Sequence, residues 1–302
     1  MPSFSSKGFP DVAKIIEYSS EIIEGPMLIS AYDLHYREIA RSFDFANLLF
    51  LDSGGYEASK DADLSDFGER DHVPRKWTLE MYENQLAKWR PGVPSVIISY
   101  DHPTARIPIR AQIRRAKKMG QGRADLMREI LLKPETGAQN FLQIDNVVAA
   151  IRGLAAFDAI GVTEKEIGNS ILTRMQNIAK LRKALMRAGI NLPIYVFGSL
   201  DPVTTPLYFL AGADIFDGLT WLRFAFHDGQ TLYKQNYGAL HLGVKTAAHV
   251  IDGRCWNCNY YYMTELELQM RRFLNDGDFN SFKFHGDHFR SALEIVKEAI
   301  GD

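Results

Sequence analysis

Three aspartates of the sequence each follow a short apolar segment, a position where α/β folds often keep reactive groups. The segments and their aspartates are Leu48–Leu51 with Asp52, Ser95–Tyr100 with Asp101, and Ala213–Phe216 with Asp217. If the segments are parallel strands, their carboxyl ends meet at one mouth of the fold. One carboxylate there can act as a nucleophile while another transfers protons. An aspartate in this position can also cap the next helix, so the pattern predicts an acidic site without proving it.

The residues that follow Asp52 are suited to holding a planar ligand. Gly54 and Gly55 allow backbone N–H groups to approach a ligand closely, and the ring of Tyr56 can stack on another ring. The same residues, together with Ser53, also fit a tight turn with a capping side chain, and the local sequence favours neither interpretation.

The two cysteines of the chain, Cys255 and Cys258, are three positions apart. A thiolate pair at this spacing is a common half of a structural Zn²⁺ site, and His285 is a candidate third ligand. The fourth ligand is not evident, and the candidates are Asp252, His249 and His288. Two buried free cysteines are the alternative, but the pair contains the only thiols of the chain, so we favour metal. So few cysteines fit a reducing cytoplasm better than secretion.

The stretch from Arg106 to Lys133 is strongly basic, with nine Lys or Arg residues against two acids. Such a density suits contact with a nucleic acid backbone, although most charge runs are simply solvated helix faces. The formal net charge of −2 and the pI of about 6.5 do not by themselves indicate nucleic acid. No window is apolar enough for a membrane span, and the first ten residues do not resemble a signal peptide. We therefore expect a cytoplasmic protein.

The 302 residues predict one α/β domain, residues 1–302, in which short apolar segments alternate with helical patterns. The leading interpretation is a TIM (β/α)8 barrel, and a doubly wound open sheet is the alternative. The span 224–290 is too long for one connection, and we expect it to be a zinc-binding insertion between strands 7 and 8. The polar segment Ala58–Arg75 is expected to be a loop at the mouth. Strands are expected at Met27–Ser30, Leu48–Asp52, Ser95–Asp101, Asn140–Ile144, Ala156–Val162, Pro193–Gly198, Ala213–Asp217 and Ser281–His285, and helices at Thr78–Trp89, Ile109–Leu132, Glu164–Ala188 and Asp287–Ile300.

Taken together, the motifs resemble the tRNA-guanine transglycosylases and their DNA-modifying paralogues. The resemblance covers roughly residues 27–300. It is carried by the segments Leu51–Tyr56, Val196–Leu200 and Ala211–Asp217, and by Cys255 and Cys258 with His285. The family is a zinc-containing TIM barrel that exchanges a guanine of a nucleic acid for a free 7-deazaguanine such as preQ0, preQ1 or queuine.

The resemblance implies a role for each matching residue. Asp217 would be the nucleophile that forms a covalent glycosyl intermediate, and Asp52 would be the general acid and base. Asp101 would bind the amide edge of the purine, and Tyr56 would stack against it. The other implied base-pocket residues are Ser53, Gly54, Gly55, Gln143, Gly161 and Arg223, and the implied zinc ligands are Cys255, Cys258 and His285.

The sequence also departs from the pattern of the tRNA enzymes. Glu57 stands where they usually have Gln, Val162 follows Gly161 in place of a second glycine, and Gly253 replaces a further cysteine. The segment Trp221–Arg223 and the short chain look closer to the DNA-modifying paralogues, so we expect DNA slightly before tRNA as the polymer. A homodimer or partner modification proteins are further expectations. There are two rival interpretations. One is a catalytically silent binding subunit, and the other is an unrelated barrel enzyme that acts on a small sugar or aldehyde.

Overall fold

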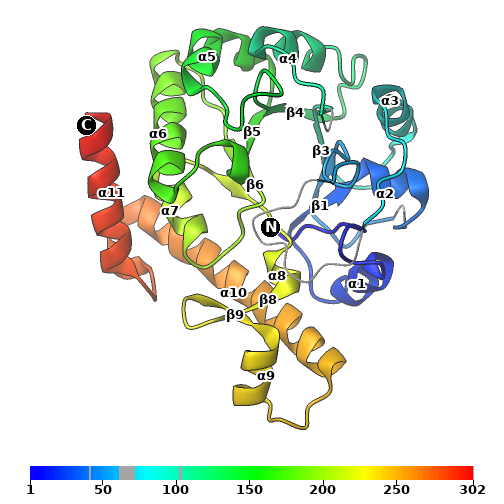
Figure 1. Ribbon diagram of the computed structural model, residues 1–302, viewed down its shortest axis with the longest axis vertical. Coiled ribbons are helices and arrows are strands. Elements are labelled where there is room, and N and C mark those ends of the chain that lie inside the picture. Colours follow the sequence, from blue (N-terminus) through cyan, green and yellow to red (C-terminus); the bar gives the residue numbers. More distant parts are fainter. Residues whose placement is uncertain (41, 61–71, 102–103, 302) are drawn as a thin grey trace.

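The computed structural model describes residues 1–40, 42–60, 72–101 and 104–301. Within these residues, seven parallel strands form one curled sheet whose order follows the chain (Figure 1). Their interior positions are almost continuously apolar, as expected for strands that are covered on both faces. The strands are β1 (Pro26–Ser30), β2 (Leu48–Asp52), β3 (Ser95–Ile98), β4 (Met127–Leu132), β5 (Ala159–Thr163), β6 (Ile194–Phe197) and β7 (Ile215–Phe216).

Helices form a layer around the outside of the sheet (Figure 1). Side chains at the start of several of them accept a hydrogen bond from the first turn, as Ser30, Thr78 and Ser170 do. The helices are α1 (Val12–Ser19), α2 (Ala31–Tyr36), α3 (Leu79–Lys88), α4 (Ile109–Ala116), α5 (Ile144–Ala149), α6 (Ile171–Arg187), α7 (Thr204–Leu210) and α11 (Gly286–Ile300), with 3-10 turns η1 (Ile151–Ala156) and η2 (Glu164–Glu166).

The start of the chain lies between the first and last strands of the sheet. Pro2 forms a parallel bridge with Gly218, two residues after β7, and Ser3 forms one with Leu28 of β1. Backbone hydrogen bonds from Phe4 to Leu28 and from Leu28 to Pro2 continue this pairing. Figure 1 accordingly shows the N-terminus inside the ring of helices. The two edges of the sheet are therefore joined through this segment, an arrangement compatible with a TIM-like α/β fold.

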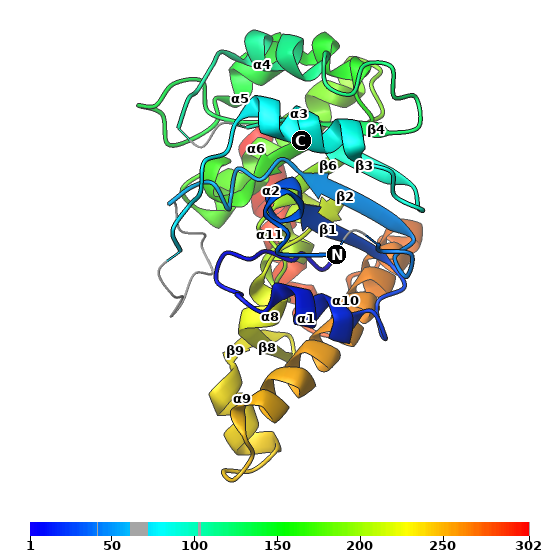
Figure 2. The ribbon, with the colours of Figure 1, turned by 90° about the vertical axis from the view of Figure 1, so that its right-hand side faces the viewer.

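The long connection after β7 contains its own helices and a hairpin. It comprises α8 (Thr220–Arg223), the hairpin β8 (Phe224–His227) and β9 (Gln230–Tyr233), α9 (Lys234–His241), the long helix α10 (Ala248–Asp276) and η3 (Phe279–Ser281). Figure 2 shows α9 and the start of α10 extending away from the sheet. The fully buried amide of Asn259 fixes α10 to the hairpin, because its nitrogen donates to Trp221 O and Phe224 O and its oxygen accepts from Phe226 N, each at 2.7 Å.

One helix prediction and two strand predictions are wrong. The segment expected to form one long helix over residues 109–132 contains α4 and then β4, and two glycines with positive φ, Gly120 and Gly122, separate them. The fourth strand is therefore β4, and the expected strand at Asn140–Ile144 is a turn that leads into α5. The expected eighth strand at Ser281–His285 is part of η3 and the loop before α11. Most of the expected loop at 58–75 lies outside the described residues.

In the described part of the chain, no helix combines the length and the apolar composition that a membrane span requires.

Candidate active site

A cavity of about 140 Å³ lies at the carboxyl ends of the strands, where parallel α/β folds gather functional side chains. Strand ends supply Asp52 as the last residue of β2, Lys133 directly after β4 and Asp217 directly after β7, and the N-terminal segment adds Ser3 and Ser5. The three aspartates predicted from the sequence all line this one cavity. Further lining residues are Gly55, Tyr56, Glu57, Asp101, Arg106, Leu131, Thr163, Glu164, Glu166, Phe197, Gly198 and Leu219.

Asp217 is held deep in the cavity, with 5% of its surface exposed. The backbone N–H of Gly198 donates to its Oδ1 at 3.2 Å. Burial raises the pKa of Asp217 from 3.8 to about 6, and the hydrogen bond from Gly198, together with the nearby hydroxyls of Tyr195 and Ser3, limits the rise. The carboxyl group is therefore ionised above about pH 6, as a nucleophile must be.

Asp52 faces the same cavity from the end of β2. Its Oδ2 accepts a hydrogen bond from Gly54 N at 3.0 Å. Burial raises its pKa well above 3.8, and the carboxylates of Asp101 and Glu57 raise it further. Asp52 therefore retains a proton to higher pH than an ordinary aspartate, which suits a general acid.

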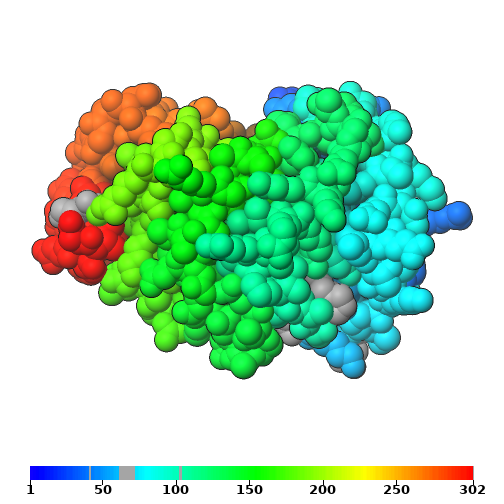
Figure 3. Space-filling view, turned by 90° about the horizontal axis from the view of Figure 1, so that it is seen from above, coloured from blue at the N-terminus to red at the C-terminus, as the bar shows by residue number. Residues whose placement is uncertain are grey.

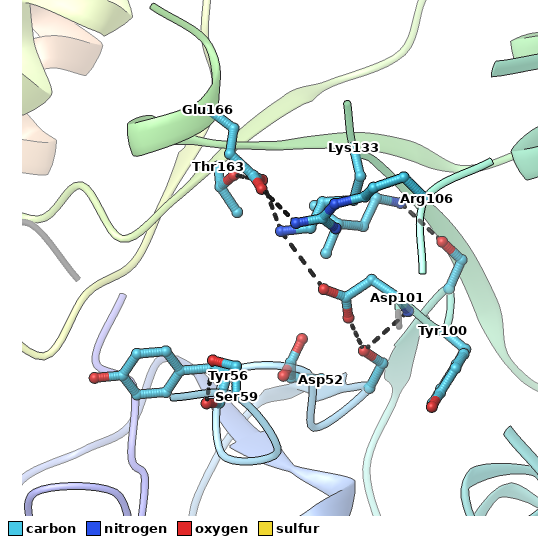
Figure 4. Close-up of polar contacts among 12 residues, drawn as sticks. Asp52, Tyr56, Ser59, Tyr100, Asp101, Arg106, Lys133, Thr163 and Glu166 are labelled. Atoms are coloured by element: carbon cyan, nitrogen blue, oxygen red, sulfur yellow. Dashed lines mark hydrogen bonds and ion pairs between the residues drawn. The ribbon is translucent and has the colours of Figure 1, made fainter. Parts of the chain in front are cut away.

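Asp101 belongs to a network of charged groups along the opposite wall (Figure 4). The hydroxyl of Ser53 donates to its Oδ1, and Lys133 Nζ lies 3.5 Å from its Oδ2. Lys133 also lies 2.7 Å from Glu166, which is paired with Arg106 at 2.9 Å. Burial opposes the charge of Lys133, but the two carboxylates hold its pKa above the ordinary value. The side chains of Asp101, Lys133, Glu166 and Arg106 therefore form a chain in which acids and bases alternate.

The two glycines after Asp52 are needed for close packing around the site. A Cβ on Gly55 would lie 2.3 Å from Oδ1 of Asp101. Gly54 has a φ of +86°, and a Cβ there would lie 2.7 Å from Cβ of Tyr32. The tight turn is therefore confirmed, and it lets Asp101 reach the cavity. Contact of these residues with a planar ligand stays a prediction.

Tyr56 lies at the edge of the cavity, where its ring is held by two cations. Lys7 Nζ lies 4.1 Å from the centre of the ring, and Arg223 donates to the hydroxyl at 3.1 Å. Arg223 thus acts on the cavity through Tyr56, and is not itself among the described lining residues.

Gln143 and Gly161 lie elsewhere than the resemblance implies. Gln143 is an exposed residue before α5, it donates to Phe141 O, and it is not among the described residues that line the cavity. The residue that directly follows the fourth strand, β4, is Lys133. Gly161 lies within β5 beside Glu129 and Phe197, so it packs the inside of the sheet.

The predicted zinc ligands are not assembled into a site. Cys255 is fully buried beside Ala225 and Tyr237, and burial raises the pKa of its thiol to about 11. The ring Nε2 of His285 donates to Gly229 O at 2.9 Å, which leaves only Nδ1 of this ring as a possible metal ligand. Among the described residues, no group of three His, Cys, Asp or Glu side chains is arranged to hold a metal ion. Zinc binding therefore stays a prediction.

The cations of the basic stretch Arg106–Lys133 fall into two groups, those that contact the protein and those that are exposed. Five of its cations contact the protein itself: Arg106, Arg115, Arg123, Arg128 and Lys133. Four others, Arg110, Arg114, Lys117 and Lys118, are exposed on or just after α4. Figure 3 shows the outer face that α4, α5 and α6 cover.

Sequence reasoning missed Lys133 and Glu166 as members of the site, together with Ser3 and Ser5. The signal for Lys133 is its position directly after an apolar triplet, Ile130–Leu132, which matches that of the aspartates. Comparison of the sequence with models of known protein families gives no match, and comparison with curated proteins gives none either.

Proposed function

We propose that this protein is a transglycosylase that replaces a guanine of a polynucleotide by a free 7-deazaguanine such as preQ0. The observation that carries the proposal is that Asp52 and Asp217 line one cavity in different environments. One carboxyl group is ionised near neutral pH and the other is biased towards its protonated form. An exchange at a sugar carbon needs one carboxyl group that attacks and another that transfers a proton.

The first half of the exchange uses both groups. The Asp217 carboxylate attacks C1′ of the target nucleotide, and the bond from C1′ to N9 of guanine breaks with its electron pair going to the base. Asp52 gives its proton to the departing guanine. The product is an ester between Asp217 and C1′, with inverted configuration.

The second half restores the enzyme. Asp52, now a carboxylate, takes the N9 proton of the incoming base as N9 attacks C1′. The ester bond breaks with its electron pair returning to Asp217, and the configuration is inverted again, so the exchange proceeds with net retention. Water must stay out during the ester stage, and the buried, enclosed position of Asp217 serves this purpose.

The proposal includes a TIM barrel as the fold. In this barrel, Pro2 and Ser3 take the position of the eighth strand, because they bridge the first and last strands of the sheet. A base inside a duplex cannot reach such a cavity, so the target nucleotide has to be flipped out. The exposed Arg110 and Arg114 of α4 are the proposed contacts to the phosphates that flank it. We take DNA as the first candidate polymer because Trp221–Arg223 resembles the DNA-modifying paralogues, and tRNA as the second.

The test is an exchange assay with labelled guanine and labelled preQ0, in which duplex DNA and bulk tRNA are offered in parallel. Wild-type protein should incorporate label into one polymer, and Asp217→Ala should abolish incorporation. Asp276→Ala, at an exposed carboxylate at the end of α10, is the matched control and should keep the activity. Absence of incorporation of either base into both polymers would refute the proposal.

A further inference from the structure

The Lys133 ammonium group occupies a site at the cavity wall that is built for a charge. It follows β4, lines the cavity and lies between the carboxylates of Asp101 and Glu166 (Figure 4). The side chain of Lys133 is only 12% exposed. An ammonium group has three N–H donors, and the ion pairs described at this group use two of them. One donor therefore remains for a molecule in the cavity, as far as the described residues show.

Glu166 fixes the position of this ammonium group. One carboxylate oxygen of Glu166 accepts from Arg106 at 2.9 Å, and the other lies 2.7 Å from Lys133 and also accepts from the hydroxyl of Thr163. A carboxylate held by three partners is itself rigid, so it orients Lys133 and does not merely neutralise it. Arg106, Thr163 and Glu166 thus form a support behind the residue that faces the cavity.

Asp101 and Lys133 together form an ordered pair of hydrogen-bonding groups. An ionised carboxylate only accepts, an ammonium group only donates, and the two lie 3.5 Å apart. The complementary ligand has a donor next to an acceptor on one planar edge. A lactam, in which a ring N–H is adjacent to a carbonyl oxygen, has this order. The amidine edge of adenine, with a ring acceptor next to an amine donor, has the opposite order and would face two unfavourable contacts.

We infer that Lys133 is a specificity-determining residue that donates to the C6 carbonyl oxygen of the base, while Asp101 accepts from the neighbouring N1–H. This inference rests on the proposed function and deepens it, because it restricts both the departing and the incoming base to purines or deazapurines with a lactam edge. It also gives a physical role to a lysine buried in a cavity that already contains several acids.

The test compares the binding of guanine with that of 6-thioguanine, which keeps N1–H and the 2-amino group but replaces the C6 oxygen by sulfur, a weaker acceptor. Dissociation constants are measured by calorimetry for wild type and for Lys133→Met. Loss of a hydrogen bond from a charged donor should weaken guanine binding between about tenfold and a hundredfold. The loss for 6-thioguanine should be several times smaller. Lys180→Met, at an exposed lysine of α6, should change neither constant.

Two further variants guard against a merely structural effect. Lys133→Gln keeps an N–H donor and should recover part of the guanine affinity, whereas Asp101→Asn should weaken both bases by the same factor, because both carry N1–H. A general distortion of the pocket by Lys133→Met would lower the affinity for both bases equally, and that result would overturn the inference.

The exchange assay separates this inference from the proposed function. If exchange occurs but Lys133→Met affects both bases equally, only the role of Lys133 fails. If both bases bind with the expected dependence on Lys133 but no polymer is modified, the role of Lys133 in binding the C6 oxygen is supported and the transglycosylase proposal fails. If wild-type protein binds neither base, both are refuted.

Discussion

A Cβ atom on Gly161 would lie 2.3 Å from Oε1 of Glu129, so the small residue and the buried acid depend on each other. Glu129 lies in β4 with no exposed surface, and both of its carboxyl oxygens lack a hydrogen-bond partner among the described residues. Burial raises its pKa well above the ordinary value, and the nearby Asp217 and Asp52 add to the rise. Burial and the two nearby carboxylates therefore favour the neutral form of Glu129 in the interior of the sheet.

This relationship predicts the effect of Gly161→Ala. The new methyl group would also lie 2.6 Å from Phe197, a lining residue of the cavity, so either β5 or the Phe197 ring must move. We expect the free energy of unfolding to fall by about 1–3 kcal/mol, as measured by urea denaturation. Gly137→Ala is the matched control, because nothing lies within 4 Å of its new methyl group. Equal stability of Gly161→Ala and wild type would show that β5 adapts freely.

Asp217→Asn should stabilise the protein at neutral pH while abolishing its activity. Burial raises the pKa of Asp217 from 3.8 to about 6, so the folded state binds this proton more tightly than the unfolded chain does. The contribution of Asp217 to the free energy of unfolding therefore falls as the pH rises from about 4 to 6, by about 3 kcal/mol in total. Because asparagine does not ionise, the free energy of unfolding of Asp217→Asn does not show this fall with pH.

The measurement is urea denaturation of wild type and Asp217→Asn at pH 4, 5, 6, 7 and 8. The two curves should coincide near pH 4, and the variant should be more stable by up to about 3 kcal/mol at pH 7 and above. A constant difference across the range would show that the pKa of Asp217 is not raised by folding. Asp276→Asn, at an exposed carboxylate, should show no such separation.

The strands that hold Asp52, Asp101 and Asp217 could be predicted because their apolar segments are short and end in polar residues. The bounds of β2, Leu48–Asp52, agree with the sequence prediction. β4 was missed because it contains Arg128 and Glu129, and the charges read as a continuation of the basic helix. The structure gives each charge a place: Arg128 donates to Ala156 O outside the sheet, and Glu129 is buried inside it. A charge pattern alone cannot distinguish these two destinations.

The role of the N-terminal segment could not be predicted either. Residues 2–4 are too few to show a strand period, and their partners are at Leu28 and Gly218, far away in the chain. Likewise, the sequence gives no sign that Lys133 would meet Glu166, because that pairing depends on the neighbouring positions of β4 and β5. Local patterns indicated the strand ends, whereas contacts between them required the three-dimensional arrangement.

Phe4→Ala tests whether the N-terminal segment closes the sheet. Phe4 is 1% exposed and packs edge-to-face on Trp221, with ring centres 5.6 Å apart, and the Trp221 indole donates to Ser3 O. Removing this ring should lower the free energy of unfolding by about 3–5 kcal/mol. Because Ser3 and Phe4 also line the cavity, base binding should weaken as well.

Phe284→Ala is the control for this variant, since Phe284 is only half-buried and lies before α11, away from the sheet edges. It should cost clearly less stability and leave base binding unchanged. If both variants lose the same stability, the packing of Phe4 has no special part in closing the sheet.

Asp52→Asn and Asp101→Asn should separate chemistry from binding. Asp52 has a strongly raised pKa and is the proposed proton donor, so its amide should reduce the exchange rate by about a hundredfold or more with little change in base affinity. Asp101 is the proposed acceptor for N1–H, so its amide should mainly raise the dissociation constant of the free base. Single-turnover kinetics together with calorimetry give the two quantities. Identical profiles for the two variants would contradict the assigned roles.

The reactivity of the two cysteines tests the zinc prediction. Burial raises the pKa of Cys255 to about 11, so at pH 8 very little thiolate is present there, and its alkylation by iodoacetamide should be slow. Cys258, one turn later on α10 and half-buried, should react faster. A chelator should leave both rates unchanged if the thiols are free, whereas bound zinc would protect both until the chelator removes it. Mass spectrometry of the alkylated protein, with metal analysis of the same sample, decides between these outcomes: about one zinc per chain together with chelator-dependent alkylation would show that the cysteines change position to bind the metal.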